Sequence, residues 1–563
     1  GQSIFLHGTA GDRKVTLVYS LNEYSLSMKL SVSSKPEEKV ELRIHMKVCD
    51  MDPVIIKGKN LHFIQARNVA YGIYVEHSKA IFTVGSLMII SRKKTNSDTT
   101  TFEVKFFVGK DVESIREIVD KEANRTVKRV VMEDGKPARY IKIAVLENGK
   151  VFTISTTDET GLMEFTVPSE NYDFSVLTES YKLVSSNSVL VVSCPSQNSF
   201  LWGPYITDPT TNSAYLNFKL SKPSTALIIL TDESGNTQKL ESGFLDTFYS
   251  IKLENLVPNE KYSVLVKVDG IEERCSFKTL GSRSFKFVIY GDTRTNEDWH
   301  EMVCEEIAKE KPLFVINVGD LVENGDLLED WNKFFKALKS LSAVSPYFPV
   351  LGNHEKNSNI YYQAFMLPKE GGDFQRRWYS FDAGDVHFIV LDSNVPEGTS
   401  LFKKQTEWLM RDLERNKDKK FKLVFFHHPF YTNTPNEEPT HEQSWRWIFE
   451  KYQVDAVFSG HIHDYERFLK NGVIYVVTGG GGAPLGFGLY SPDRKHLPGS
   501  VKEAAGFLHY ILAEVREDGI KFTVKSVGKY VKVGKIKMII PWKVVLDEFY
   551  VKARSRVYAL PDR

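Results

Sequence analysis

The pattern of apolar and polar residues along the chain changes near residue 284. Before it, short stretches alternate apolar and polar positions between turns rich in Gly, Pro, Asn, Asp and Ser, as in KVELRIHMKV (39–48) and TFEVKFFV (101–108). A period of two between turn signals is typical of antiparallel β-sandwiches. One stretch, KDVESIREIVDKEA (110–123), has helical periodicity, and we expect it to connect two β units.

After residue 284, apolar strands alternate with amphipathic helices. FKFVIYGD (285–292) and PLFVINVGD (312–320) are expected strands, and NEDWHEMVCEEIAKE (296–310) and LLEDWNKFFKALKSL (327–341) are expected helices. Strands that alternate with helices predict an α/β domain in layers, with largely parallel pairing.

The length of 563 residues exceeds what one hydrophobic core can organise. A cluster of prolines (Pro195, Pro204, Pro209) predicts a boundary near residue 195. We therefore expect a multidomain chain. Its predicted parts are a β-rich domain (1–110), a helical connector (111–134), a small β-sandwich (135–195), a second sandwich (196–283) and the α/β domain (284–563).

Charge and cysteine content narrow the function classes only in part. The 73 Lys and Arg nearly balance the 72 Asp and Glu, so nothing predicts a nucleic-acid partner. No apolar run reaches the ~20 residues of a membrane span, and the first residues show no signal peptide. Cys194 and Cys275 bracket the second sandwich, so they are either a disulfide or, like the other two cysteines, free thiols.

The candidate chemistry lies where five expected strands end. Each of these strands is followed by oxygen or nitrogen donors, and ten of the 14 histidines lie after residue 284. In parallel sheets, ligands bind beyond the carboxyl ends of the strands. The donors, in chain order, are Asp292, Asp320, Asn353, His354, His427, His428, His461 and His463.

This donor set predicts a metal site. It contains no thiolate, and carboxylate, amide and imidazole ligands suit Mn, Fe, Zn or Co ions. Six or so ligands exceed the needs of one ion that keeps an open position, so two divalent or trivalent ions are expected. A pair of ions clamps the attacking and leaving oxygens during displacement at phosphorus. Asp320 is the candidate to bridge them.

The ordered motifs GD (291–292), GD (319–320), GNHE (352–355), His427 and GHIH (460–463) resemble those of the calcineurin-like metallophosphoesterase superfamily. GHIHDYER (460–467), HHPFY (427–431) and GGGGAP (479–484) resemble its purple acid phosphatase branch. This resemblance covers residues 196–563 and implies a four-layer αββα catalytic domain. Upstream, GPYITDP (203–209) with Leu256 and Tyr262 resembles a fibronectin type III-like domain, and residues 135–194 resemble a carboxypeptidase-regulatory-like sandwich.

The resemblance also implies roles for the strand-end residues. Asp292 and His463 would hold one ion, Asp320 would bridge, and a metal-bound hydroxide would be the nucleophile. His354 would protonate the leaving oxygen or stabilise charge on the phosphoryl group. His428 would either contact substrate or face away. The second ion would be held by Asn353, His427 and His461.

Three positions depart from the purple acid phosphatase pattern. That branch has a tyrosine ligand three residues after the bridging aspartate, where this chain has Glu323, so we expect no purple protein. GDLVENG (319–325) also resembles the GDxVDxG form of other superfamily members, which implies that Asn324 would contact phosphate. Arg294, in GDTR, suits a phosphate oxygen. His300 would either complete the first ion's ligands or lie behind them.

The expected function is metal-dependent hydrolysis of a small-molecule phosphate ester, and the motifs do not separate monoesters from diesters. An alternative is a multi-module surface protein, in which the β modules bind a polymer, a partner or the cell envelope and the esterase is secondary. A nuclease would need a basic channel, which the balanced charge does not predict. Sandwich modules ahead of such an esterase suggest an exported, extracytoplasmic protein.

Overall fold

The computed structural model describes residues 3–553 except 11–12, 22–24, 34–38, 48–53, 58–60, 66–69, 76–77, 84–85, 95–98, 110, 120–125, 134, 167–171, 178–181, 187–188, 194–197, 243–245, 435–440, 486–495 and 534–535. The chain forms two compact units. The first comprises residues 1–199, 221–225 and 243–247, and the second comprises residues 200–220, 226–242 and 248–563. None of the described helices is both long and apolar enough to cross a bilayer.

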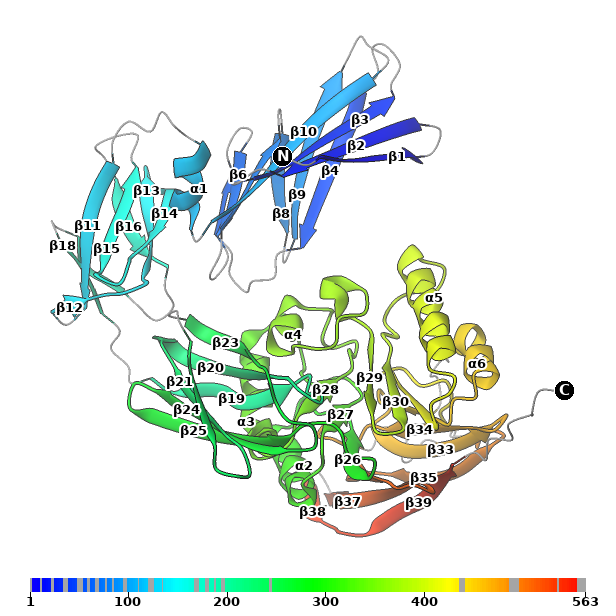
Figure 1. The fold of residues 1–563 in the computed structure, drawn as a ribbon. Coiled ribbons are helices and arrows are strands. Elements are labelled where there is room, and N and C mark those ends of the chain that lie inside the picture. The colour runs from blue at the N-terminus through cyan, green and yellow to red at the C-terminus, as the bar shows by residue number, and fades with distance from the viewer. Residues whose placement is uncertain are drawn as a thin grey trace. The chain divides into compact units, whose positions relative to one another are not determined.

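The first unit begins with two antiparallel sheets (Figure 1). The larger has the order β1-β2-β3-β10-β7-β6-β5, and the smaller has the order β4-β9-β8. Ile73, Val75 and Val104 of the larger sheet pack against Ile89 of the smaller. The strands are β1 (Ser3–Ala10), β2 (Arg13–Leu21), β3 (Ser25–Ser33), β4 (Lys39–Lys47), β5 (Val54–Lys57), β6 (Leu61–Gln65), β7 (Ala70–Val75), β8 (Ser78–Thr83), β9 (Ser86–Lys94) and β10 (Thr99–Gly109).

A second pair of sheets comes next in the same unit. One has the order β12-β11-β18-β17 with β15 also on β11, and the other has the order β14-β13-β16. Their shared core includes Val131, Ile143 and Phe165. The strands are β11 (Thr126–Glu133), β12 (Lys136–Pro137), β13 (Lys142–Glu147), β14 (Lys150–Thr156), β15 (Leu162–Thr166), β16 (Asp173–Val176), β17 (Lys182–Ser186) and β18 (Val189–Ser193).

The expected connector is built into these sandwiches. Its helix is α1 (Val112–Val119), and Val112 and Ile115 pack with Phe107 of β10 and Ile154 of β14 in one apolar cluster. The rest of the expected connector contains β11, which is a central strand of the second pair of sheets. Val112 and Ile115 of α1 therefore join the two pairs of sheets through a common core.

The second unit begins with another sandwich of two sheets, ordered β19-β20-β23 and β22-β21-β24-β25. Leu256 and Tyr262 lie in its core, and the Val257 N–H donates to Tyr262 Oη at 2.9 Å. Cys275 and Cys304 are buried free thiols, whereas Cys49 and Cys194 lie outside the described residues. The strands are β19 (Phe200–Thr207), β20 (Ala214–Ser224), β21 (Leu227–Thr231), β22 (Thr237–Glu241), β23 (Asp246–Leu253), β24 (Lys261–Val268) and β25 (Ile271–Lys278).

Two seven-stranded sheets form the centre of the remaining α/β domain. The first has the order β28-β27-β26-β36-β37-β38, with β39 also on β37, and the second has the order β29-β30-β31-β32-β34-β33-β35. The sheets face one another through Phe287 and Phe314 on the first and Phe388 on the second. The strands of the first sheet are β26 (Phe285–Tyr290), β27 (Val315–Asn317), β28 (Tyr347–Pro349), β36 (Phe507–Val515), β37 (Gly519–Val533), β38 (Ile536–Pro541) and β39 (Val545–Lys552). Those of the second are β29 (Tyr379–Ala383), β30 (Val386–Val390), β31 (Phe421–Phe425), β32 (Ala456–Ser459), β33 (Asp464–Lys470), β34 (Val473–Thr478) and β35 (Ser500–Ala505).

Helices cover the outer side of each sheet. Trp408 of α5 and Trp445 of α6 share a core cluster with Val424 of β31, and His300 of α2 hydrogen-bonds Tyr290 of β26. The predicted order, all-β modules followed by a layered α/β domain, is confirmed. The helices are α2 (Glu297–Glu310), α3 (Leu328–Ser342), α4 (Asn359–Ala364), α5 (Ser400–Arg415) and α6 (Glu442–Lys451), with a short 3₁₀ turn η1 (Asp373–Gln375).

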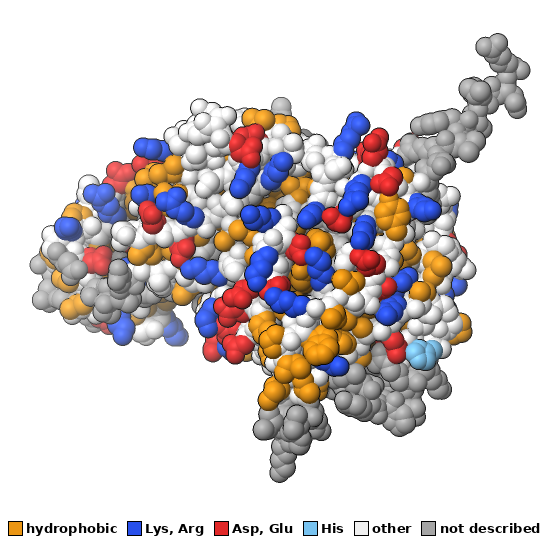
Figure 2. Space-filling model, turned by 90° about the horizontal axis from the view of Figure 1, so that it is seen from below, with side chains coloured by type: hydrophobic (Ala, Val, Ile, Leu, Met, Phe, Trp, Pro, Cys, Tyr) orange, Lys and Arg blue, Asp and Glu red, His pale blue; other side chains and the backbone are white. Residues whose placement is uncertain are grey.

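The surface carries charge of both signs. On the face seen from below, Lys and Arg side chains alternate with Asp and Glu side chains, and apolar side chains lie between them (Figure 2). Charges of opposite sign that lie close together cancel much of each other's field. This face therefore presents no large region of one charge.

Candidate metal centre

The candidate ligands follow the carboxyl ends of parallel strands in both sheets of the α/β domain. β26, β27 and β28 are parallel neighbours in the first sheet, and β31 and β32 are parallel neighbours in the second. Since the two sheets pack face to face, these ends meet at one edge of the domain. The donors that were predicted to converge thus come from both sheets. Three of the strands belong to the first sheet, and two belong to the second.

Three of the candidate ligands have backbone conformations that non-glycine residues rarely adopt. Asp292, Asp320 and His461 have φ angles of 57°, 54° and 68°. Such residues are strained, and the strain persists where the surrounding structure fixes the backbone. Gly352 and Gly460 supply the space, because a Cβ at these positions would lie 2.2 Å from Asp320 Oδ1 and 2.4 Å from Asp292 Oδ2.

The donor atoms lie close together. His427 Nε2 is 3.2 Å from Asp320 Oδ1 and 3.1 Å from Asn353 Oδ1, and His461 Nδ1 is 3.2 Å from the same Asn353 oxygen. His463 Nε2 is 3.6 Å from Asp292 Oδ1. The ligand atoms of Asp292, Asp320 and His427 all lie within 4.8 Å of one another. The structure therefore brings together all six residues expected to hold metal.

The chemistry of these donors fits metal ions. His427 Nδ1 donates to the Val318 carbonyl at 2.9 Å, which directs Nε2 toward the oxygens of Asp320 and Asn353. His463 is oriented in the same way, because its Nδ1 donates to the Pro484 carbonyl at 2.8 Å. Lone pairs of nitrogen and oxygen thus face one another, and bound cations satisfy them. The structure shows candidate ligand groups for metal and does not identify the ion.

The pKa values of the buried candidate ligands reflect how closely these groups are packed. Burial lowers the pKa of His427, but the Asp320 carboxylate beside it outweighs this and raises the pKa to about 9. Burial raises the pKa of Asp292 well above its usual range. Burial also raises the pKa of Asp320, and the stronger opposing attraction of His427 brings it below its usual range. The opposite directions of these shifts show how closely His427 and the two carboxylates interact.

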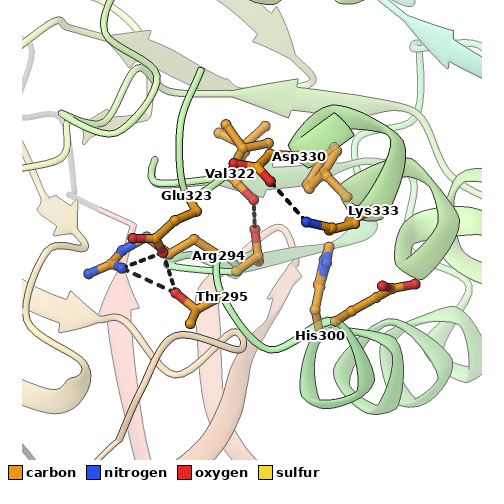
Figure 3. Close-up of a pocket in the computed structure, with 11 residues that line it drawn as sticks. Arg294, Thr295, His300, Val322, Glu323, Asp330 and Lys333 are labelled. Carbon is orange, nitrogen blue, oxygen red and sulfur yellow. Dashed lines mark hydrogen bonds and ion pairs between the residues drawn. The ribbon is translucent and has the colours of Figure 1, made fainter. Parts of the chain in front are cut away.

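Arg294 and His354 lie at the rim of this group. Arg294 Nε is 3.4 Å from Asp320 Oδ2, and its Nη1 donates to Glu323 Oε2 at 2.8 Å (Figure 3). His354 Nδ1 donates to the Glu323 carbonyl at 2.6 Å, and its Nε2 is 3.9 Å from Asp320 Oδ2. Both side chains therefore border the Asp320 carboxylate at the edge of the ligand group.

His428 and Asn324 have local partners. His428 Nδ1 is 2.8 Å from Ser393 Oγ, and its ring centroid is 4.6 Å from that of His461. His427, His428 and His461 form a second group of ligand atoms close enough for one ion. The side-chain oxygen of Asn324 accepts from the Asp326 N–H at 3.1 Å, which closes a turn within its own loop.

His300 lies apart from the ligand group. The residue is 1% exposed, and its ring stacks on Phe334 with centroids 5.3 Å apart. Its Nε2 lies 3.2 Å from Tyr290 Oη. His300 belongs to neither group of clustered ligand atoms found among the described residues, and it forms part of the wall of a neighbouring pocket (Figure 3).

Glu355 is a site residue to which the sequence pattern assigned no role. It is fully buried, and its carboxylate accepts from the N–H groups of Asp320 at 3.0 Å, Gly352 at 2.6 Å and Leu321 at 2.7 Å. Burial, and then the Asp320 charge, raise the pKa of Glu355 to about 7. Glu355, the last residue of GNHE, thus holds the loop that carries Asp320. Its place in that motif is the sequence feature that could have pointed to this role.

The residues after GHIH have structural partners. Tyr465 Oη and Arg467 Nε both donate to Asp547 Oδ2 at 2.7 Å, which joins β33 to β39. Glu466 is fully buried and accepts from the Asn433 N–H at 3.0 Å. This part of the motif therefore fixes the loop that carries His461 and His463.

Comparison with known proteins agrees with this geometry. Residues 285–465 match the calcineurin-like phosphoesterase family. The chain is 29% identical over 265 residues to purple acid phosphatase 21 of Arabidopsis thaliana, and the match covers 43% of this chain and 60% of that protein. It is 32% identical over 178 residues to acid phosphatase type 7 of Mus musculus, which covers 27% of this chain and 40% of that protein. The matched regions thus span less than two thirds of either relative.

A solved structure supports the fold. The purple acid phosphatase PPD1 from yellow lupin seeds aligns with a TM-score of 0.50 at 17% identity, over 70% of this chain and 89% of that chain. At this identity the likeness concerns architecture alone. The resemblance expected from the ordered motifs is confirmed by the family match and the relatives.

Proposed function

We propose that this chain, which carries a calcineurin-like phosphoesterase domain with purple acid phosphatase homologues, hydrolyses phosphoric esters with the help of two metal ions. The observation that carries this proposal is the convergence of two carboxylates, one amide and three imidazoles at the strand ends of two packed sheets. Relatives with phosphatase names support the same reaction class.

The six residues would hold the ions as two overlapping sets. Asp292 and His463 would bind one ion, and Asn353, His427 and His461 would bind the other, with Asp320 shared between them. When bound, such ions provide a water nucleophile at neutral pH and neutralise charge on the phosphoryl oxygens. The position of His300 does not support it as a ligand, and we leave it out of both sets.

The rim residues would act on the substrate itself. Arg294 would bind a phosphoryl oxygen through its guanidinium. His354 donates its Nδ1 proton to the Glu323 carbonyl, so its Nε2 is the atom that would carry a proton to the leaving oxygen. His428 and Asn324 would contribute further contacts to the phosphate.

A direct assay tests this function. The purified protein is assayed on p-nitrophenyl phosphate and bis-p-nitrophenyl phosphate with added Mn, Fe, Zn, Co or Ca, and bound metal is counted by elemental analysis. We expect metal-dependent turnover with two ions per chain, and a loss of at least ~100-fold in Asp320→Asn. Asp298→Asn, at an exposed position of α2, is the matched control and should retain full activity. Absence of metal-dependent turnover on both esters would refute the proposal.

For the N-terminal modules we propose domain boundaries near residues 195 and 283, with α1 and β11 belonging to the sandwiches beside them, and a role in holding the enzyme at its place of action outside the cytoplasm. The support is the shared core around α1, which makes two sandwiches one compact body. Pull-down of isolated envelope polymers with the full chain tests the role. Equal recovery by a chain lacking residues 1–195 would contradict it.

A further inference from the structure

A pocket opens beside the metal group, on the side of Arg294. It has a volume of about 170 Å³ and lies between the loop that carries Asp292, the loop that carries Asp320 and helices α2 and α3 (Figure 3). Leu321, Val322 and Phe334 provide apolar wall. A cavity of ~150 Å³ is known to accept benzene, so this pocket has room for one six-membered ring.

Arg294 connects the pocket to the reaction site. The same guanidinium lines the pocket, reaches within 3.4 Å of Asp320 Oδ2 and pairs with Glu323 at 2.8 Å. A phosphate bound at Arg294 therefore has the metal group on one side and the pocket on the other. A substituent on that phosphate can enter the pocket without leaving the reaction site.

The charges of the pocket disfavour a second negative charge on the substrate. Its lining holds the cations Arg294 and Lys333 and the carboxylates Glu297, Glu323 and Asp330, and Lys336 of α3 pairs with Glu297 at 2.5 Å. Arg294 pairs with Glu323, and Lys333 pairs with Asp330 at 3.2 Å. A phosphodiester carries one negative charge near neutral pH, whereas a phosphomonoester carries nearly two. The cations of the pocket lining are already paired with carboxylates, and the Glu323 carboxylate beside Arg294 repels a second charge, so the monoester is the poorer fit.

We propose that the site prefers phosphodiesters to phosphomonoesters, and that the pocket beside Arg294 holds the ester group that stays on the phosphate. This inference rests on the proposed function and names the substrate class of the same site. Water releases a proton to solvent and its oxygen bonds to phosphorus, the bond from phosphorus to the other ester oxygen breaks, and that oxygen leaves as an alcohol with the proton from His354. The product monoester carries one more negative charge, which Glu323 repels.

Substrate preference tests the proposal. The full chain with added metal is assayed on bis-p-nitrophenyl phosphate and p-nitrophenyl phosphate, and we expect kcat/KM to be at least ~10-fold higher for the diester. Lys333→Trp places a large ring at the mouth of the pocket and should lower kcat/KM for the diester about 10-fold more than for the monoester. Lys339→Trp, exposed on the same helix outside the pocket, is the matched control and should change neither rate.

Glu323 acts on the substrate through Arg294 and through its charge, so it is a positioning residue with its own test. Glu323→Gln should raise the ratio of monoester to diester kcat/KM about 10-fold, mainly through a lower KM for the monoester. Glu323→Asp keeps the charge and should keep the diester preference. A general loss of structure would lower both rates together and would not move this ratio.

Binding without turnover provides a second measurement. In the Asp320→Asn protein, calorimetry should give a lower Kd for diphenyl phosphate than for phenyl phosphate, and Lys333→Trp should remove the difference. Faster turnover of the monoester with no effect of Lys333→Trp on the ratio would overturn the diester proposal and leave the phosphoesterase function intact. Metal binding without turnover of either ester would overturn both.

Discussion

At the scale of single residues, Glu355 shows how the loop that carries Asp320 is held. A buried carboxylate usually requires hydrogen bonds, and Glu355 obtains them from backbone N–H groups of Asp320, Leu321, Val322 and Gly352. These bonds hold the loop in which Asp320 has its strained φ of 54°. Glu355 thereby fixes the position of Asp320, a candidate metal ligand.

Replacing Glu355 by Ala should therefore weaken metal binding and stability together. The loss leaves buried N–H groups without acceptors, which costs about 3 kcal/mol of the free energy of unfolding, and residues that orient a ligand typically contribute ~10–100-fold in metal affinity. Titration calorimetry and urea unfolding measure the two effects. Glu329→Gln, exposed on α3, is the control. Unchanged metal affinity in Glu355→Ala would contradict the positioning role.

At the scale of elements, Asp547 holds β39 against the strand that comes after the histidine motif. It accepts from Tyr465 Oη and from Arg467 Nε, and its side chain is 9% exposed. A partly buried acceptor shared by a phenol and a guanidinium contributes more than a surface ion pair, because removing it leaves two donors unmatched.

Asp547→Ala should lower the free energy of unfolding by about 2 kcal/mol and reduce activity only through the position of His461 and His463. Urea unfolding of the variant measures this. Glu548→Gln removes the neighbouring exposed pair with Lys521 and should have no measurable effect. Equal changes in the free energy of unfolding of the two variants would show that the link between β33 and β39 contributes no more than an exposed ion pair.

His387 of β30 links its own strand to β29 and to helix α5. It makes a pH-dependent contribution to the stability of the fold. Its Nδ1 and Nε2 each lie 2.7 Å from a carboxylate, Asp382 on β29 and Asp412 on α5. Lys419 also pairs with Asp382, and Arg415 lies 3.6 Å from Asp412. Burial lowers the pKa of His387, but hydrogen bonds to the two carboxylates outweigh it, so the folded pKa is raised above the usual value.

A raised folded pKa stabilises the protein fully below the unfolded pKa of about 6.5, and the contribution is lost as pH rises through the folded value. The difference in free energy of unfolding between wild type and His387→Gln should therefore be largest near pH 6 and shrink toward pH 9. Urea unfolding at several pH values measures it. A difference that stays constant over this range would exclude protonation of His387 as the source.

At the scale of the whole molecule, sequence reasoning succeeded where local order along the chain determines the structure. Asp292, Asp320, Asn353, His427 and His461 each come after a strand, and the carboxyl ends of packed strands must meet. The place of His300 was not predictable, because helical periodicity gives a face of α2 and not its distance from another strand's end. The partners of Glu355 and Asp547 come from loops and strands distant in sequence, which no local pattern specifies.

The division of the chain into two compact units leads to a prediction on truncation. All candidate ligands lie in the second unit, together with most of the sandwich of residues 200–280. That sandwich is packed into the α/β domain: Trp202 stacks on Phe335 of α3 with centroids 4.5 Å apart and donates from Nε1 to Asn332 Oδ1 at 2.7 Å, and Tyr205 Oη donates to the Ala364 carbonyl at 2.6 Å. Removing it would expose this aromatic surface.

Two truncations separate these contributions. A chain that begins at residue 196 keeps the aromatic contacts and should hydrolyse p-nitrophenyl esters with a kcat/KM within about twofold of the full chain. A chain that begins at residue 284 exposes Phe335 and should aggregate or be less stable. Its free energy of unfolding should fall by several kcal/mol, on the order of the loss of one buried Trp and one buried Tyr. Light scattering, unfolding and the ester assay measure both chains. Equal stability and activity of the two truncated chains would mean that the sandwich of residues 200–280 is a separable spacer. Loss of activity in the chain that begins at residue 196 would mean that the first unit is needed for catalysis.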